Sequence, residues 1–303
     1  MHYILDPLYY AVSWVLVQFH SFLGLLFGKS AHESIKWSLS IILLVVLIRV
    51  ILIPLFVKQI KSQRALTALQ PHMKEIQKRY KDDRQKQSEE MMKLYKEHKT
   101  NPLASCFPIL AQAPIFFALF TVLNGISTGR GHGLMKGAVL ESAKQAQFFG
   151  ADLSSRFIGS TGNTQTKVVT IFLILFMSAS TFATQRQLMT KGMPKMDSSN
   201  NMMLQQQKIM LYVFPIIFAI SGVNFPVGVL LYWGTTNLWT FGQQMYVIKR
   251  NPTPGSPAYD EWRKKQEAKN KSDVTPTESN EGSVATEEPK GQRKQPKRKR
   301  RNK

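Results

Sequence analysis

The chain has 303 residues, 44% of them hydrophobic, and a formal net charge of +21 at pH 7. A basic excess of this size points to nucleic acid or an anionic membrane surface as a partner. Cys106 is the only cysteine, which excludes an intrachain disulfide and a cysteine-rich metal site. The mean hydropathy of −0.17 is misleading, because the apolar residues are bunched into blocks and the charges lie between them.

The N-terminal segment, residues 1–34, contains an apolar run from Leu8 to Leu26. Asp6 precedes this run and no Lys or Arg does, which is unlike the basic start of a signal peptide. The polar residues of the run fall largely on one side of a helix: Ser13, Gln18, His20 and Ser21. We therefore predict a helix that lies in the plane of the membrane interface, on the outer side of the membrane, with a sixth span as the alternative.

Five further segments are predicted to cross the membrane, because each is a mostly apolar stretch near the roughly 20 residues that a spanning helix needs. The last apolar block is long enough for two spans, and we divide it at Pro226 because proline removes a helix donor and clashes with the preceding turn. The spans cover residues 35–57, 105–124, 167–188, 209–224 and 226–248. The predicted fold class is an all-α integral membrane protein with a five-span core.

Lys and Arg are divided unevenly among the segments between the spans. Residues 58–104 carry 12 of them, residues 189–208 carry 3 and residues 249–303 carry 16, whereas residues 125–166 carry 4. Basic residues near spans collect on the cytoplasmic side. We therefore expect the first three segments in the cytoplasm, and residues 125–166 and the N-terminus outside.

The segment 58–104 is rich in helix formers, with apolar residues recurring every three or four positions. We predict two helices, over residues 58–80 and 83–98, that form a charged antiparallel hairpin in the cytosol. Asp82 and Asp83 suit the turn and the cap between them.

The C-terminal tail, residues 249–303, has almost no apolar residues after Asn251 and is predicted to be disordered. Its final basic run would bind anionic lipid or RNA through their negative charge. The run consists of Lys297, Arg298, Lys299, Arg300 and Arg301.

Four blocks of sequence carry a family resemblance: RVILIPL, QPHMKEIQKRYKDD, EEMMKLYKEHKTNPLASCFPILAQAPIFFALF and FPVGVLLYWGTTNLWTFGQQ. They resemble the first core span, the cytosolic hairpin with the second span, and the last span of the YidC insertases of bacteria, which are related to mitochondrial and thylakoid insertases. The resemblance extends over roughly residues 1–250, in order and at the family's spacing. The short N-terminal segment resembles Gram-positive members, although it lacks their lipoprotein cysteine.

The resemblance implies that the protein moves hydrophobic segments of nascent membrane proteins from the cytosol into the bilayer without using ATP. They would pass through a hydrophilic groove that is open to cytosol and lipid. The implied partners are nascent membrane proteins, the ribosome, the Sec translocon and anionic lipids. We expect a monomer without a cofactor, in the bacterial plasma membrane.

Arg49 is the leading candidate for the groove. It lies nine residues before Lys58, about 13 Å into the first span at 1.5 Å per residue. A charge at the bilayer centre costs about 2.5–3.5 kcal/mol on insertion scales, and none of the five spans contains an acidic residue to pair with it. Arg49 either extends its side chain to the interface or faces a wet groove. The resemblance implies the groove, where Arg49 would attract the acidic or polar tail of a substrate.

Polar residues of other spans would line the same groove, or bond one helix to another. The candidates are Gln112, Gln185, Thr235, Thr236, Asn237, Gln243 and Gln244. The resemblance places Tyr232 and Trp233 near the arginine, with simple packing as the alternative. It also implies an apolar slide for the substrate helix, for which lipid contact is the alternative. The slide residues would be Ile109, Phe116, Phe117, Phe120, Leu230 and Leu231.

No catalytic pattern is complete in the sequence. The glycine-rich TGRGHG block lacks the lysine of a phosphate-binding loop, and His32-Glu33 lacks the second histidine of a zinc protease. We therefore expect neither an enzyme nor a metal site. Two other functions stay open: a small-anion transporter or channel that uses Arg49, and a scaffold that assembles helices without inserting them. The five spans show no internal repeat, which disfavours a transporter.

Overall fold

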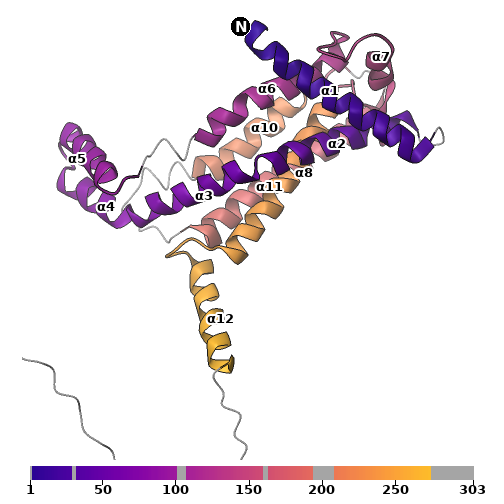
Figure 1. Cartoon of the computed structure of the whole chain (residues 1–303). Coiled ribbons are helices and arrows are strands. Elements are labelled where there is room, and N and C mark those ends of the chain that lie inside the picture. The colour runs from indigo at the N-terminus through magenta and orange to yellow at the C-terminus, as the bar shows by residue number, and fades with distance from the viewer. Residues whose placement is uncertain (1, 29–31, 101–106, 160–162, 194–207, 274–303) are drawn as a thin grey trace, which may run out of the picture. The chain divides into compact units, whose positions relative to one another are not determined.

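Helices make up most of the structure, a computed structural model that describes residues 2–28, 32–100, 107–159, 163–193 and 208–273 (Figure 1). The N-terminal and hairpin helices are α1 (His2–Phe27), α2 (Glu33–Ile51), α3 (Ile53–Ala68), α4 (Gln70–Arg79) and α5 (Arg84–Glu97). Next come α6 (Phe107–Thr128), α7 (Gly137–Gln145) and the antiparallel strands β1 (Gln147–Phe148) and β2 (Ala151–Asp152). The last helices are α8 (Thr164–Gln187), the π-helical turns η3 (Leu188–Gly192) and η4 (Ile209–Val213), α10 (Phe214–Gly222), α11 (Val227–Arg250) and α12 (Pro257–Asp273).

The chain divides into two units, residues 1–263 and residues 264–303. The described part of the second unit is the C-terminal end of α12. The first unit contains the hydrophobic core, in which α2 packs against α1 and α11, and α11 packs against α8 (Figure 1). Leu16 of α1, Trp37 of α2 and Leu230 of α11 are at most 1% exposed.

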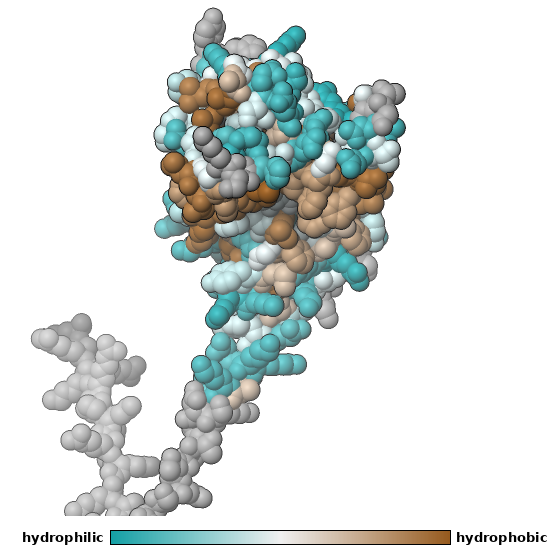
Figure 2. Space-filling model, turned by 90° about the vertical axis from the view of Figure 1, so that its right-hand side faces the viewer, coloured by the Kyte–Doolittle hydropathy of each residue, from teal (hydrophilic) through white to brown (hydrophobic). Residues whose placement is uncertain are grey.

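The outward faces of the core helices are apolar, which is the reverse of a water-soluble protein. Phe172 and Leu175 on α8 and Ile217 and Ile220 on α10 are more than half exposed. Figure 2 shows brown, apolar surface gathered in a band with hydrophilic surface on either side of it. A contiguous apolar surface of this kind suits lipid contact, so the protein is an all-α membrane protein.

Three helices are long and apolar enough to cross a membrane by length and composition, counted among the described residues only. They are Leu5–Phe27, Glu33–Ile51 and Thr164–Gly192. Gln112–Thr128 and Ile209–Gly222 are shorter apolar helices. The five-span count and the interfacial placement of α1 therefore stay predictions.

Prolines set the breaks between consecutive helices. Leu52 separates α2 from α3 two residues before Pro54, and Leu69 separates α3 from α4 two residues before Pro71. In both places a proline in the first turn removes an amide donor from the helix ladder. The chain also turns between α10 and α11, where Pro226 precedes the first residue of α11. The predicted break at this proline is therefore confirmed.

The segment between the first two predicted spans contains three helices, because α3 continues from α2 as far as Ala68 before α4 and α5 pair side by side (Figure 1). Asp83 caps α5 by accepting a 3.0 Å hydrogen bond from the amide of Lys86. The predicted cap is therefore confirmed.

Part of the tail is ordered, which corrects the prediction of disorder from residue 249 onward. Residues Pro257–Asp273 form α12, whose first turn is capped by Ser256 accepting from the Tyr259 amide at 3.3 Å. Composition was misleading here, because the Lys, Glu, Gln and Ala that lower the hydropathy are also strong helix formers.

The polar residues of α1 do not share one solvent-exposed face, contrary to the expectation for an interfacial helix. Ser13 is fully buried, and its hydroxyl accepts a 2.9 Å bond from the Leu134 amide in the glycine-rich loop. Gly133 makes this approach possible, because a Cβ there would lie 2.1 Å from the Ser13 hydroxyl. The loop is therefore bonded to α1.

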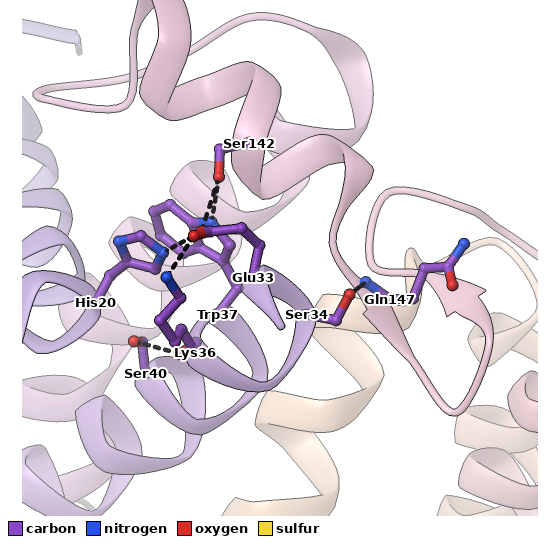
Figure 3. A network of polar contacts seen from close by, with 8 residues as sticks. All are labelled: His20, Glu33, Ser34, Lys36, Trp37, Ser40, Ser142 and Gln147. Atoms are coloured by element: carbon purple, nitrogen blue, oxygen red, sulfur yellow. Dashed lines mark hydrogen bonds and ion pairs between the residues drawn. The ribbon is translucent and has the colours of Figure 1, made fainter. Parts of the chain in front are cut away.

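A second polar network joins α1 to α2 and to α7 (Figure 3). Glu33 lies at its centre, with His20 Nε2 2.8 Å and the Ser142 hydroxyl 3.3 Å from one of its oxygens, and Lys36 bonded to the other. The indole of Trp37 donates to Ser142 at 2.9 Å and stacks on the His20 ring at 4.1 Å. The start of α2 is thus fixed to both of its neighbours.

We predict that Gly133→Ala destabilises the fold more than Gly129→Ala. Both glycines have positive φ, +61° and +69°, so each alanine carries the left-handed backbone cost of about 1–2 kcal/mol. Only at Gly133 would the new Cβ also overlap Ser13, since nothing lies within 4 Å of a Cβ at Gly129. Thermal unfolding in detergent measures the difference. Equal Tm losses would show that α1 is not held by this contact.

Candidate functional site

A small open recess lies between α2, α6 and α11. Its lining consists of three apolar side chains, Val45, Ile48 and Leu119, and four polar ones, Arg49, Gln112, Tyr232 and Thr236. The structure thus brings together four of the predicted groove candidates from three separate helices: Arg49, Gln112, Tyr232 and Thr236.

Arg49 occupies the last turn of α2, three residues before Leu52 separates that helix from α3. Its side chain is half-buried, and no carboxylate pairs with it anywhere in the described part of the chain. Three neutral polar side chains line the recess together with it: Gln112, Tyr232 and Thr236. The positive charge is therefore stabilised by dipoles rather than by a counter-ion, which leaves it able to attract an anion.

The opposite walls of the recess supply neutral polar groups. Gln112 comes from α6, and Tyr232 and Thr236 lie four residues apart on α11, which places them on one face of that helix. Amide and hydroxyl groups can bind water or a peptide backbone without neutralising the guanidinium. Together with Arg49 they form a polar site inside a largely apolar protein.

Trp233 is not part of the recess lining. Its ring packs against Phe116 of α6 at 5.7 Å, Phe218 of α10 at 4.6 Å and Phe225 of the α10–α11 turn at 5.6 Å. Successive helical residues point about 100° apart, so Tyr232 enters the recess while Trp233 joins an aromatic cluster between three elements. The two residues were predicted as a pair, and the structure separates their roles.

The predicted slide residues do not form one surface. Phe117 is 54% exposed and Phe116 and Phe120 are half-buried, but Leu230 and Leu231 are only 1% and 5% exposed. These two leucines are core residues, because their faces of α11 are covered by neighbouring helices. Ile109 lies in the first turn of α6. Exposed apolar side chains that the sequence reasoning missed lie on α10: Ile216, Ile217 and Ile220.

Asn237 and Gln185 lie at a helix–helix interface instead of the recess. The Asn237 side-chain amide donates to the Met177 carbonyl at 3.3 Å and to the Thr181 hydroxyl at 3.0 Å, joining α11 to α8. Gln185 is half-buried one turn beyond Thr181, on the same face of α8. The alternative role of a bond between helices therefore describes Asn237.

Three lining residues, Val45, Ile48 and Leu119, were not predicted. Helical periodicity could have identified them, since Val45 is one turn before Arg49 and Leu119 is two turns after Gln112. The basic run from Lys297 to Arg301 lies outside the described residues.

We predict opposite effects for Asn237→Ala and Gln112→Ala. Asn237→Ala removes a bond between helices, which is worth about 0.6 kcal/mol on average and at most about 1.7 in membranes. It should lower the Tm in detergent and leave the activity of the folded protein unchanged. Gln112→Ala should leave the Tm unchanged and reduce the activity per folded molecule. If Asn237→Ala reduced the activity per folded molecule, Asn237 would contribute to the functional site as well as to the helix–helix interface.

Comparison with known proteins shows which family the chain belongs to. A family model described as "60Kd inner membrane protein" matches residues 28–254. A membrane protein insertase YidC of Streptomyces avermitilis is 58% identical over 255 residues, which are 82% of this chain and 59% of that protein. The chain thus spans less than two thirds of that relative.

Another membrane protein insertase YidC, from Tropheryma whipplei, is 36% identical. The match covers 98% of this chain and 95% of that protein. A crystal structure of an active YidC insertase with its first transmembrane domain resolved superposes with a TM-score of 0.50 at 27% identity. The match covers 80% of this chain and 46% of the crystallised one. With a family match over most of its length, the chain belongs to the YidC family of membrane protein insertases.

Proposed function

We propose that the chain inserts hydrophobic segments of nascent membrane proteins into the bilayer, through a groove of which the recess at Arg49 is the polar part. The observation that carries the proposal is a half-buried guanidinium without a carboxylate partner among the described residues, facing polar groups from two other helices. If this charge served only to stabilise the fold, a permanent anionic partner would be expected beside it. A transient anionic partner, the polar tail of a substrate, suits an open recess.

Insertion by this route requires no chemical energy source. Water in the recess shortens the apolar barrier that a polar tail must cross, and Arg49 holds the tail briefly by charge. The apolar segment then moves sideways into lipid, driven by its transfer out of water. The exposed apolar side chains of α6 and α10, such as Phe117 and Ile217, offer a surface along which that segment can move.

The proposal includes an orientation and partners. The basic hairpin of α4 and α5 and the C-terminal tail lie in the cytoplasm, and α1 and the loop with α7 lie outside, because Lys and Arg are concentrated in the former. Substrates arrive from the ribosome or with the Sec translocon. The tail binds ribosomal RNA or anionic lipid, and the chain works as a monomer.

An Arg49 series tests the function. Arg49→Ala should leave the protein folded and membrane-integrated, since removing an intramembrane charge lowers its own insertion cost. It should nevertheless impair substrates with acidic tails most and neutral tails least. Arg49→Lys should retain most activity, because a wet groove needs charge rather than a bidentate fork. Arg49→Glu should be worst for acidic tails, because attraction becomes repulsion.

The assay compares insertion of matched substrates that differ only in tail charge, in cells depleted of the native protein. Equal loss for all tails would show that Arg49 only keeps the recess hydrated. Degradation of the variants would show that Arg49 is structural. Chloride or phosphate flux that depends on Arg49 in liposomes without any substrate would favour the small-anion transporter instead.

A second test concerns the tail. Removing residues 274–303, which contain the terminal basic run but leave α12 intact, should weaken ribosome binding. The binding of the full chain should fall steeply with salt because it depends on phosphate contacts. Insertion of short substrates into liposomes should stay intact. Loss of that insertion would make the tail part of the insertion machinery, and salt-insensitive ribosome binding would exclude a phosphate-directed contact.

A further inference from the structure

The segment after β2 completes the first turn of α11. The amide of Val227 donates to the Ser155 carbonyl and the amide of Gly228 donates to the Leu153 carbonyl, both at 2.9 Å. These amides belong to the first turn of a helix, where no intrahelical acceptor exists, and Pro226 offers no side-chain cap. Gly228 permits the close approach, since a Cβ there would lie 3.3 Å from the Leu153 carbonyl oxygen.

The same segment also holds the C-terminal end of α6. Arg156 donates from Nη2 to the Asn124 side-chain oxygen at 3.0 Å and from Nε to the Ser127 hydroxyl at 3.3 Å. That hydroxyl in turn donates to the Ser154 carbonyl at 2.6 Å. Arg156 also lies near the last turn of α6, where a positive charge is favoured by the helix dipole. One short segment thus binds α6 through a guanidinium and α11 through its backbone.

These contacts lie beyond one end of the recess. Asn124 is five residues from Leu119 along α6, about 7.5 Å, and Gly228 is four residues from Tyr232 along α11, about 6 Å. Between them the rings of Phe120 and Phe225 meet edge to face at 5.6 Å. An aromatic pair and then a polar clamp therefore close the seam between α6 and α11 on the side of the α7 loop.

We propose that Arg156 is a positioning residue whose clamp on Asn124 and Ser127 seals the groove against the outer side of the membrane. The inference rests on the proposed function and its orientation. The clamp holds the outer end of α6 against α11, so that the guanidinium of Arg49 is reached by water from the hairpin side alone. A polar clamp suits this task because directional hydrogen bonds fix one register of α6 against the segment after β2.

Without the seal, an uncompensated charge in the recess would stand in water that is continuous across the membrane. Thiol labelling measures this directly, because Cys106 is the only native cysteine. In a Cys106→Ser background, Thr236→Cys places a thiol in the recess lining. A membrane-impermeant maleimide is then applied to right-side-out and to inverted membrane vesicles.

With the clamp intact, Thr236→Cys should react in inverted vesicles only. Adding Arg156→Met should raise the labelling rate in right-side-out vesicles at least tenfold, and Arg156→Lys, which cannot reach both acceptors in a fork, should give an intermediate rate. Gly228→Ala, which pushes the segment from α11, should also raise it. Arg130→Met is the matched control, since it removes the same charge from an exposed position of the same loop and should change nothing.

Labelling in inverted vesicles should be unchanged in every variant, which shows that the fold is retained. If Arg156→Met does not change the labelling rate of Thr236→Cys in right-side-out vesicles, the proposed role of Arg156 is wrong. The proposed function would not be affected by that result. Equal labelling of the intact protein from both sides would overturn the seal. Absence of labelling from either side would show that the recess is dry, and the proposed function would then fail together with the seal.

Discussion

The positive charge of Arg49 on an otherwise apolar helix is the constraint on which the rest of the structure depends. A guanidinium keeps its proton, so the protein must either pair it, hydrate it or expose it. The described chain places it in an open recess together with Gln112, Tyr232 and Thr236. Close apolar packing of α2, α6 and α11 against Arg49 would bury a bare charge, and the recess between these helices leaves its guanidinium beside polar groups instead.

Side-chain hydrogen bonds join neighbouring elements at the α7 end of the core helices, and proline breaks lie at the hairpin end. Toward the α7 loop, α1 is fixed by Ser13, the start of α2 by Glu33 and the end of α6 by Arg156. Toward the hairpin, proline breaks at Pro54 and Pro71 interrupt the continuous helix. A core that is firmly bonded at one end and interrupted at the other suits a groove with a single aqueous opening.

The sequence was sufficient for the features that depend on composition and on proline. The intramembrane arginine, the break before α11 and the Asp83 cap each follow from a local physical rule. Membership of the YidC family followed from four blocks of residues and agrees with the comparisons.

The direction of side chains could not be predicted in the same way. The first two turns of α11, residues 227–233, contain no strongly polar residue on any side, so the burial of Leu230 and Leu231 depends on which neighbours cover them. Asn237 was indistinguishable from a groove residue until its bonds to α8 were known. Arg156 lies in a polar loop without periodicity, where no pattern marks the helix that it binds. The order of α12 was missed because low hydropathy predicts disorder and charged helices alike.

The measurement that tests insertion most directly is reconstitution of the purified chain into liposomes with a short single-span substrate. The substrate carries an acidic tail and is added from outside, without ATP, ribosomes or other proteins. The account predicts that the tail becomes protected from added protease only in vesicles that contain the chain. Substrate that binds these vesicles and remains fully sensitive to protease would contradict it, and would leave a scaffold that holds helices without moving them.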